Sequence, residues 1–64
     1  MFDTELRVLR REGQAVGFGF PDGFRLPSGR MLDAASVAVM KASGLVAVRT
    51  VPLTRLFIVV PACR

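Results

Sequence analysis

The chain alternates short apolar runs with turns that contain glycine and proline, a pattern that predicts a β-rich α+β domain. Its clearest repeat is Ala-Val-Gly-Phe-Gly-Phe over residues 15–20, where large and small side chains alternate strictly. Alternation with period two is typical of a strand that has one packed face. We expect Val16, Phe18 and Phe20 to form that packed face. The opposite, glycine face is bare, so it leaves room for a close neighbour.

Four more short strands are predicted from short apolar runs. After residue 20, Pro21-Asp22-Gly23 predicts a turn, because proline presets φ and glycine supplies a positive φ. The last apolar run of the chain is continuous, which is typical of a strand buried on both faces. Besides residues 15–20, the predicted strands are residues 4–10, 24–26, 45–51 and 56–60.

Residues 33–43 fit two patterns. Asp33 can cap the N-terminus of a helix, and Gly44 stands where a C-terminal glycine ends one. Val37 and Val39 instead alternate with their neighbours, as they would in a strand. The alanines of this stretch favour a helix. We predict one short helix near 33–43 and keep the strand as the alternative.

The size of the chain limits how it can be stabilised. With 64 residues it forms one domain at most, residues 1–64, and so small a domain is only marginally stable by itself. It has no histidine and only one cysteine, Cys63, so neither a disulfide within the chain nor a zinc site is expected. A hydrophobic content of 52% then favours completion by another chain, as a homo-oligomer or on a larger protein partner. The candidate interface residues are Val16, Phe18, Phe20, Leu56, Phe57, Ile58 and Val59.

Three features predict a cytoplasmic protein that does not enter a membrane. A single cysteine fits a reducing compartment. The first thirteen residues are charged and lack the apolar stretch of a secretory signal. The longest apolar run, residues 56–63, has eight residues, whereas a membrane-spanning helix needs about 20.

The residue types that catalysis needs are mostly missing. General acid–base catalysis most often uses histidine, and the chain has none. Cys63 has no histidine to activate it as a nucleophile. Turn and capping roles account for Asp22 and Asp33, and the glycines of residues 17–23 lie in a strand and a turn rather than in a dinucleotide-binding loop. We therefore expect a protein that is not an enzyme and that has no cofactor or metal.

Positive charge allows nucleic acid as a further partner. The net charge is +4, and the whole excess lies in residues 34–64, because residues 1–33 hold five arginines and five acidic residues. A basic patch attracts nucleic acid, although cations this far apart are more often an ordinary solvated surface. Exposed aromatic rings can stack on bases. Phe18, Phe20 and Phe24, however, alternate as core residues do, and we expect them in the core.

Most of the chain resembles a segment of one enzyme family. Residues 10–16, Arg-Arg-Glu-Gly-Gln-Ala-Val, followed by Gly19, are similar to the motif R-x-x-G-[EQ]-D-[IV]-x-x-G, with alanine at the aspartate position. Residues 27–45, which begin Pro-Ser-Gly-Arg-Met-Leu, are similar to a second motif, P-A-G-x-x-L-x-x-A. Val48, Arg55 and the apolar run 56–60 are similar to a third motif, V-x-V…P-R-V-A-[IV]. The family with these motifs is the molybdopterin molybdenumtransferases, which include MoeA and the gephyrin E-domain.

This resemblance implies a function without catalysis. In that family the apolar run leads into a Ser-Thr-Gly-Asp-Glu-Leu loop that builds the cofactor site, whereas here Val60 is followed by Pro-Ala-Cys-Arg. We therefore expect a fragment or a shortened relative without catalytic residues. The resemblance favours a structural or binding module, self-associating or docked on a partner, that is similar to the middle segment of a protein of molybdenum cofactor biosynthesis.

A second resemblance covers residues 4–51 and supports the alternative function. Leu6, the stretch 13–16 and Phe20-Pro21 are similar to the first hairpin of the swapped-hairpin regulators and antitoxins of the AbrB and MazE type. Val37 and Val39, with residues 44–48, would then form the second hairpin. This resemblance implies a dimeric DNA-binding regulator or antitoxin. Its candidate nucleic-acid contacts are Arg7, Arg10, Arg11 and Arg25.

Overall fold

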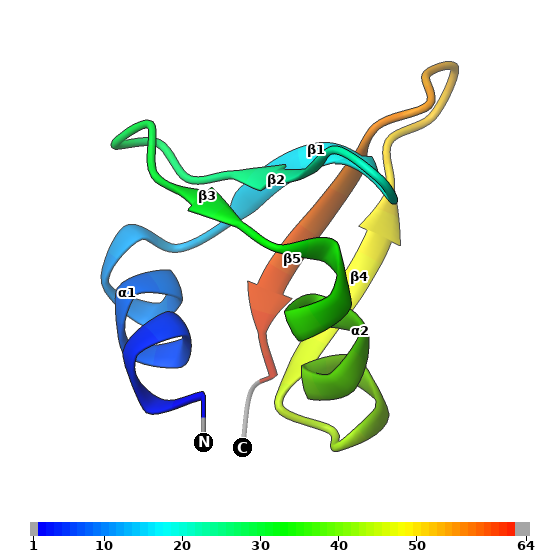
Figure 1. Cartoon of the computed structure of the whole chain (residues 1–64). Helices are drawn as coiled ribbons and strands as arrows, with labels where there is room; N and C mark the ends of the chain where they lie inside the picture. The colour runs from blue at the N-terminus through cyan, green and yellow to red at the C-terminus, as the bar shows by residue number, and fades with distance from the viewer. Residues whose placement is uncertain (1, 63–64) are drawn as a thin grey trace.

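The computed structural model describes residues 2–62, which form two helices and five strands in one open sheet (Figure 1). The protein is therefore a small, β-rich α+β fold, as the apolar pattern predicts. All strand pairs are antiparallel, and the order across the sheet is β3-β2-β1-β5-β4. Along the chain the elements are α1 (Asp3–Glu12), β1 (Ala15–Gly19), β2 (Gly23–Arg25), β3 (Met31–Leu32), α2 (Ala34–Ala42), β4 (Val46–Thr50) and β5 (Phe57–Pro61).

The centre of the sheet pairs β1 with β5, two strands that are far apart in the sequence. Ala15 lies opposite Val59, and Val16 lies opposite Ile58. Two hairpins flank this pair, because β1 turns into β2 and β4 turns into β5. Four of the predicted strands are thus confirmed. β3 has only two residues, too few for an apolar pattern to predict it.

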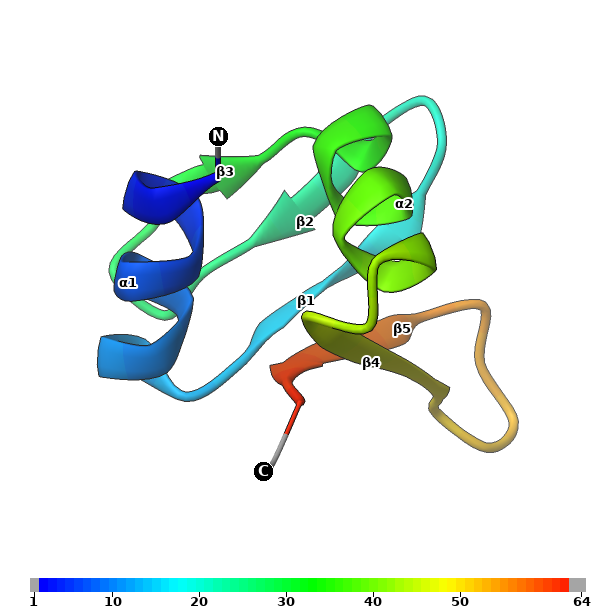
Figure 2. The same ribbon diagram turned by 90° about the horizontal axis from the view of Figure 1, so that it is seen from below.

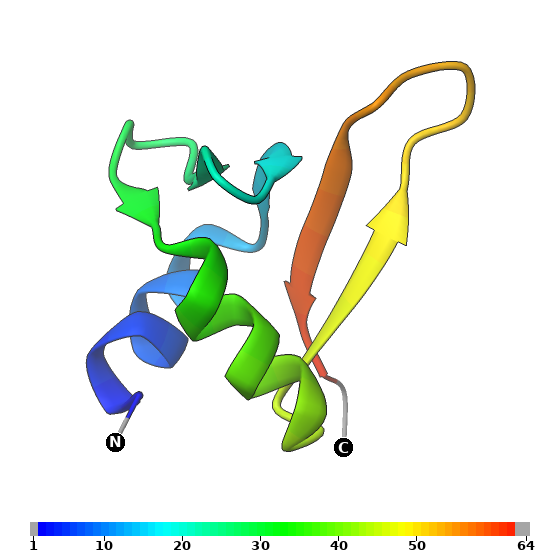
Figure 3. The ribbon, with the colours of Figure 1, turned by 45° about the vertical axis from the view of Figure 1, so that its right-hand side comes forward.

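Both helices lie on one face of the sheet, and the sheet curls around them (Figures 1 and 2). We call this helix-covered face the inner face and the opposite one the outer face. Figure 3 shows the tip of the β4–β5 hairpin projecting away from both helices. The core fills the space between the helices and the inner face, and every element contributes to it. Its buried residues are Val8, Leu9, Ala15, Phe24, Leu26, Leu32, Val37, Met40, Val46 and Val59.

The prediction of a strand at residues 4–10 is wrong, because this stretch is the helix α1. Val8 and Leu9 are both buried. Neighbouring residues of a strand point to opposite faces, whereas on a helix both can reach one core. Phe2 and Leu6 also pack on that core, so the apolar positions follow helical spacing. Two further features favour a helix here: acidic residues in the first turn with basic ones in the last, and Gly13 at the C-terminal end with φ of 97°.

The predicted helix near 33–43 is confirmed, and the strand alternative for this stretch is wrong. The Asp33 carboxylate caps α2 by accepting a hydrogen bond from the Ser36 N–H at 3.3 Å. At the other end Gly44, with φ of 77°, lets the Leu45 N–H reach the Met40 carbonyl at 2.9 Å. This is the Schellman arrangement, in which a residue of positive φ satisfies the last carbonyls of a helix.

The packed face of β1 is the glycine face, so the prediction for Val16, Phe18 and Phe20 is wrong. Phe18 and Phe20 are 57% and 89% exposed, whereas Phe24 is buried as predicted. The reason is that other elements fill the space above the glycines. A Cβ on Gly19 would lie 3.8 Å from the Phe57 ring and 3.9 Å from the Phe24 ring. The close neighbours expected beside the glycines are therefore the backbone of β2 at Gly17 and side chains of β2 and β5 at Gly19.

Candidate protein interface

The outer face of the sheet carries one row of residues that crosses all five strands. The register places Val16 of β1 opposite both Arg25 of β2 and Ile58 of β5. Ile58 in turn lies opposite Arg49 of β4, and Arg25 lies opposite Met31 of β3. The order along the row is therefore Met31, Arg25, Val16, Ile58, Arg49. We call it the outer row; two aliphatic side chains form its middle, with an arginine on each side.

Burial shows that this row points away from the core. Ala15 precedes Val16 on β1, and Val59 follows Ile58 on β5. Both are fully buried beneath the helices. Because side chains alternate along a strand, Val16 and Ile58 point to the opposite side. They are half-buried, which their sheet neighbours explain, while Arg25 and Arg49 are exposed. No helix of residues 2–62 covers them, since both helices lie on the inner face.

Two more apolar side chains extend the middle of the outer row along the strands. Phe18 follows on β1, and Leu56 precedes β5. Together with Val16 and Met31 they line a shallow hollow of about 360 Å³. Asp22, in the turn between β1 and β2, borders the same hollow. The outer face is thus an apolar strip with arginines beside it and a single carboxylate at one end.

The structure brings four of the seven predicted interface residues together on this face. Val16, Phe18, Leu56 and Ile58 lie on β1 and at β5, which are neighbours in the sheet. Val59 is fully covered by its own chain, and this buried position contradicts its assignment to an interface. Phe57 is on the inner face as well, next to Gly19. Phe20 lies in the turn after β1, where it is the most exposed phenylalanine of the described chain.

The candidate nucleic-acid contacts do not share a surface. Arg7, Arg10 and Arg11 are exposed on α1, which packs on the inner face. Arg25 is on the outer face, as part of the outer row. The three arginines of α1 are interspersed with three acidic residues on the same helix, so this helix adds no excess of positive charge.

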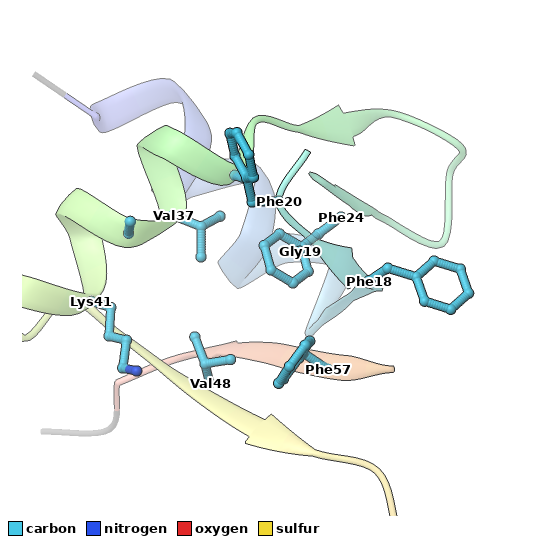
Figure 4. A pocket seen from close by; sticks show the side chains of 10 residues that line it. Phe18, Gly19, Phe20, Phe24, Val37, Lys41, Val48 and Phe57 are labelled. Atoms are coloured by element: carbon cyan, nitrogen blue, oxygen red, sulfur yellow. The ribbon is translucent and has the colours of Figure 1, made fainter. Parts of the chain in front are cut away.

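A second hollow, of about 410 Å³, opens between α2 and the end of β1 (Figure 4). Its walls are apolar and include Phe24, Val37, Val48 and Phe57. Lys41 at its rim is the one charged residue among those that line it. In Figure 4 the Phe18 ring points away from this hollow, toward the outside of the sheet.

The described residues offer little chemistry beyond binding. Among residues 2–62 no three cysteine, aspartate or glutamate side chains gather as a metal site would need. The same residues include no buried polar or charged side chain. Cys63, considered above as a nucleophile, lies outside the described residues. Neither helix of the described chain is long and apolar enough to span a membrane.

Comparisons with family models, curated proteins and solved structures give no match for this chain. The fold and the outer face define its class: a small α+β domain in which no helix of the described residues covers one face of the sheet. Two members of this surface, Arg49 and Met31, are missing from the sequence-based candidates. Arg49 lies in a predicted strand and Met31 does not, and only the register between the strands aligns both with Val16.

Proposed function

We propose that the protein is a non-catalytic binding module that docks on another protein chain through the outer face of its sheet. The observation that carries this proposal is the cross-strand pair Val16 and Ile58, which lies at the centre of the sheet and is not covered by any helix of residues 2–62. Sheets in which one face is apolar usually bury that face against another layer. Burial of such a surface gains about 25 cal/mol for each Å² removed from water.

The resemblance to the middle segment of the molybdopterin molybdenumtransferases supports the same function. A segment of a larger assembly has faces that neighbouring parts cover, and the outer face would have this role. The chain has no histidine, and two of its carboxylates have structural partners, because Asp33 caps α2 and Glu12 binds Ser28, which supports a module without catalysis. The partner is then a protein chain, and the process that the resemblance favours is molybdenum cofactor biosynthesis.

Site-specific photo-cross-linking tests this function. A photoreactive phenylalanine analogue replaces Phe18 on the outer face or, as the control, Arg7 on α1. We expect one discrete adduct with a partner protein chain when position 18 carries the photoreactive analogue, and none when position 7 carries it. Excess unlabelled wild-type protein should compete the adduct away. The double variant Val16→Thr, Ile58→Thr keeps β-branched side chains, so its strands should still form. It loses the apolar contact and should therefore not compete. Equal competition by both competitors would mean that the outer face is not the docking surface.

The second candidate function is a dimeric DNA-binding regulator or antitoxin. The observation that favours it is the exposure of Arg7, Arg10 and Arg11 on one helix. Val37 and Val39, which this resemblance assigns to a hairpin, lie on α2. Retention on duplex DNA that falls steeply with salt, and that weakens in Arg10→Gln, would support this function. Absence of retention at low salt would exclude it for the duplexes used.

A further inference from the structure

The two arginines of the outer row stand at a defined spacing on either side of its apolar middle. Arg25 and Arg49 are three strands apart in the same register row. Neighbouring strands are about 4.8 Å apart, so the Cα atoms of these arginines are separated by about 14 Å along the sheet. Both side chains are exposed. The guanidinium groups are thus free to meet carboxylates of a bound surface.

A second copy of the chain that packs face to face in the same register would not provide those carboxylates. If two outer faces pack with their strands aligned around a two-fold axis through the middle of the row, each arginine lies over an arginine of the other copy. Like charges in contact are unfavourable. The acidic residue that borders this face, Asp22, lies in a turn at one end of the strip. The other acidic residues are on α1 or at the start of α2.

The chemistry of the strip also favours protein over single-stranded nucleic acid. Proteins that bind single strands stack successive bases on aromatic side chains. Phe18 is the one aromatic residue in the described apolar strip of the outer face. The other apolar residues of this strip are Val16, Met31, Leu56 and Ile58. An aliphatic middle with charged sides is instead typical of a protein interface, which has an apolar centre and a polar rim.

Resting on the proposed function, we infer that the partner surface is acidic: an apolar centre with a carboxylate on each side, about 14 Å apart. The carboxylates would meet Arg25 and Arg49, and the apolar centre would cover Val16 and Ile58. An extended peptide matches this spacing. Its residues i, i+2 and i+4 point to one side, and i and i+4 are about 13 Å apart. A strand with the sequence Glu-Thr-Leu-Thr-Glu therefore presents the required groups.

The probe is a cyclised β-hairpin peptide that displays Glu-Thr-Leu-Thr-Glu on one strand, titrated into the full 64-residue chain. Amide chemical shifts in nuclear magnetic resonance report where it binds. A peptide with Gln-Thr-Leu-Thr-Gln is the uncharged control. We expect shift changes at Val16, Arg25, Ile58 and Arg49, with affinity about threefold lower for each carboxylate removed. Arg25→Glu and Arg49→Glu should each weaken binding of the acidic peptide by more than the loss of one carboxylate does. Arg7→Glu on α1 should leave this binding unchanged.

Each other outcome overturns the inference in a distinguishable way. Equal binding of the glutamine peptide at the outer face would reject the acidic partner and leave the proposed docking face intact. Dilution-dependent shifts at Val16 and Ile58, with a dimer in sedimentation, would make a second copy the occupant. Tighter binding of a thymidine oligonucleotide at Phe18 would reject a protein partner, and with it the proposed function. Absence of outer-face shifts with the acidic peptide would reject the acidic partner, while the cross-linking experiment would still decide the docking face.

Discussion

Glu12, in the last turn of α1, accepts two hydrogen bonds from Ser28, one from its backbone N–H at 2.7 Å and one from its hydroxyl at 2.8 Å. The two residues are 16 positions apart in the sequence. Ser28 belongs to the turn between β2 and β3, so this contact joins the first helix to one edge of the sheet. It is a polar contact between α1 and the sheet, outside the apolar core.

Replacement of this carboxylate should weaken the attachment of α1. In Glu12→Gln the amide oxygen can still accept from the Ser28 N–H, but the amide nitrogen can only donate to the Ser28 hydroxyl, so both contacts lose the assistance of the carboxylate charge. We expect the free energy of unfolding in urea to fall by about 0.5 kcal/mol, because both groups are near solvent. Glu5→Gln removes the same charge from α1 without touching Ser28 and should cost less. An equal loss in both variants would show that charge, rather than the hydrogen bond, matters.

Gly17 has no space for a side chain. A Cβ at this position would overlap the Gly23 carbonyl oxygen and lie 2.8 Å from the Phe24 Cα, both in the backbone of β2. We expect Gly17→Ala to lower the free energy of unfolding by about 2 kcal/mol or more. Gly29→Ala is the matched control, since it has no atom within 4 Å and its cost is the strain of φ at 97°, about 1 kcal/mol. A smaller loss at position 17 than at 29 would contradict the close approach of β1 and β2.

Leu53 holds an unfavourable backbone conformation at the tip of the β4–β5 hairpin. Its φ is 64°, and its side chain is fully exposed, so packing does not compensate for the strain. Leu53→Gly should raise the free energy of unfolding by about 0.5 kcal/mol, because relief of a left-handed conformation exceeds the added entropy of glycine in the unfolded chain. Leu53→Ala keeps the strain and should bring no gain. Stabilisation by alanine equal to that by glycine would exclude backbone strain as the cause.

Leu9 tests the assignment of α1 to the core. Its side chain is fully buried between this helix and the sheet, so Leu9→Ala should cost about 3 kcal/mol. A domain of this size has little stability to spare, and the variant should be largely unfolded at 37 °C by circular dichroism. Val39→Ala, on the exposed side of α2, should remain folded. A folded Leu9→Ala with unchanged melting temperature would show that α1 does not pack on the core.

Local patterns in the sequence predict the elements whose signals are contained in a few neighbouring residues. The cap at Asp33 and the glycine at 44 define α2, because a helix end needs particular side chains and φ values within one turn. Period-two alternation predicts β1, since each strand residue faces opposite to the next. For residues 4–10 the same alternation misleads, because Leu6 and Val8 fit a strand while Phe2 and Leu9 complete a helical face.

The sequence alone therefore determined the fold class, the four longer strands, α2 and its caps, and the scarcity of catalytic residue types. Tertiary structure decided which face of β1 is buried, because the rings of Phe24 and Phe57 arrive from other strands to fill the space above its glycines. It also decided the outer row. Register between β1, β2, β4 and β5 depends on long-range hydrogen bonding and on how the core packs. No local pattern can place Arg25 and Arg49 on either side of Val16 and Ile58.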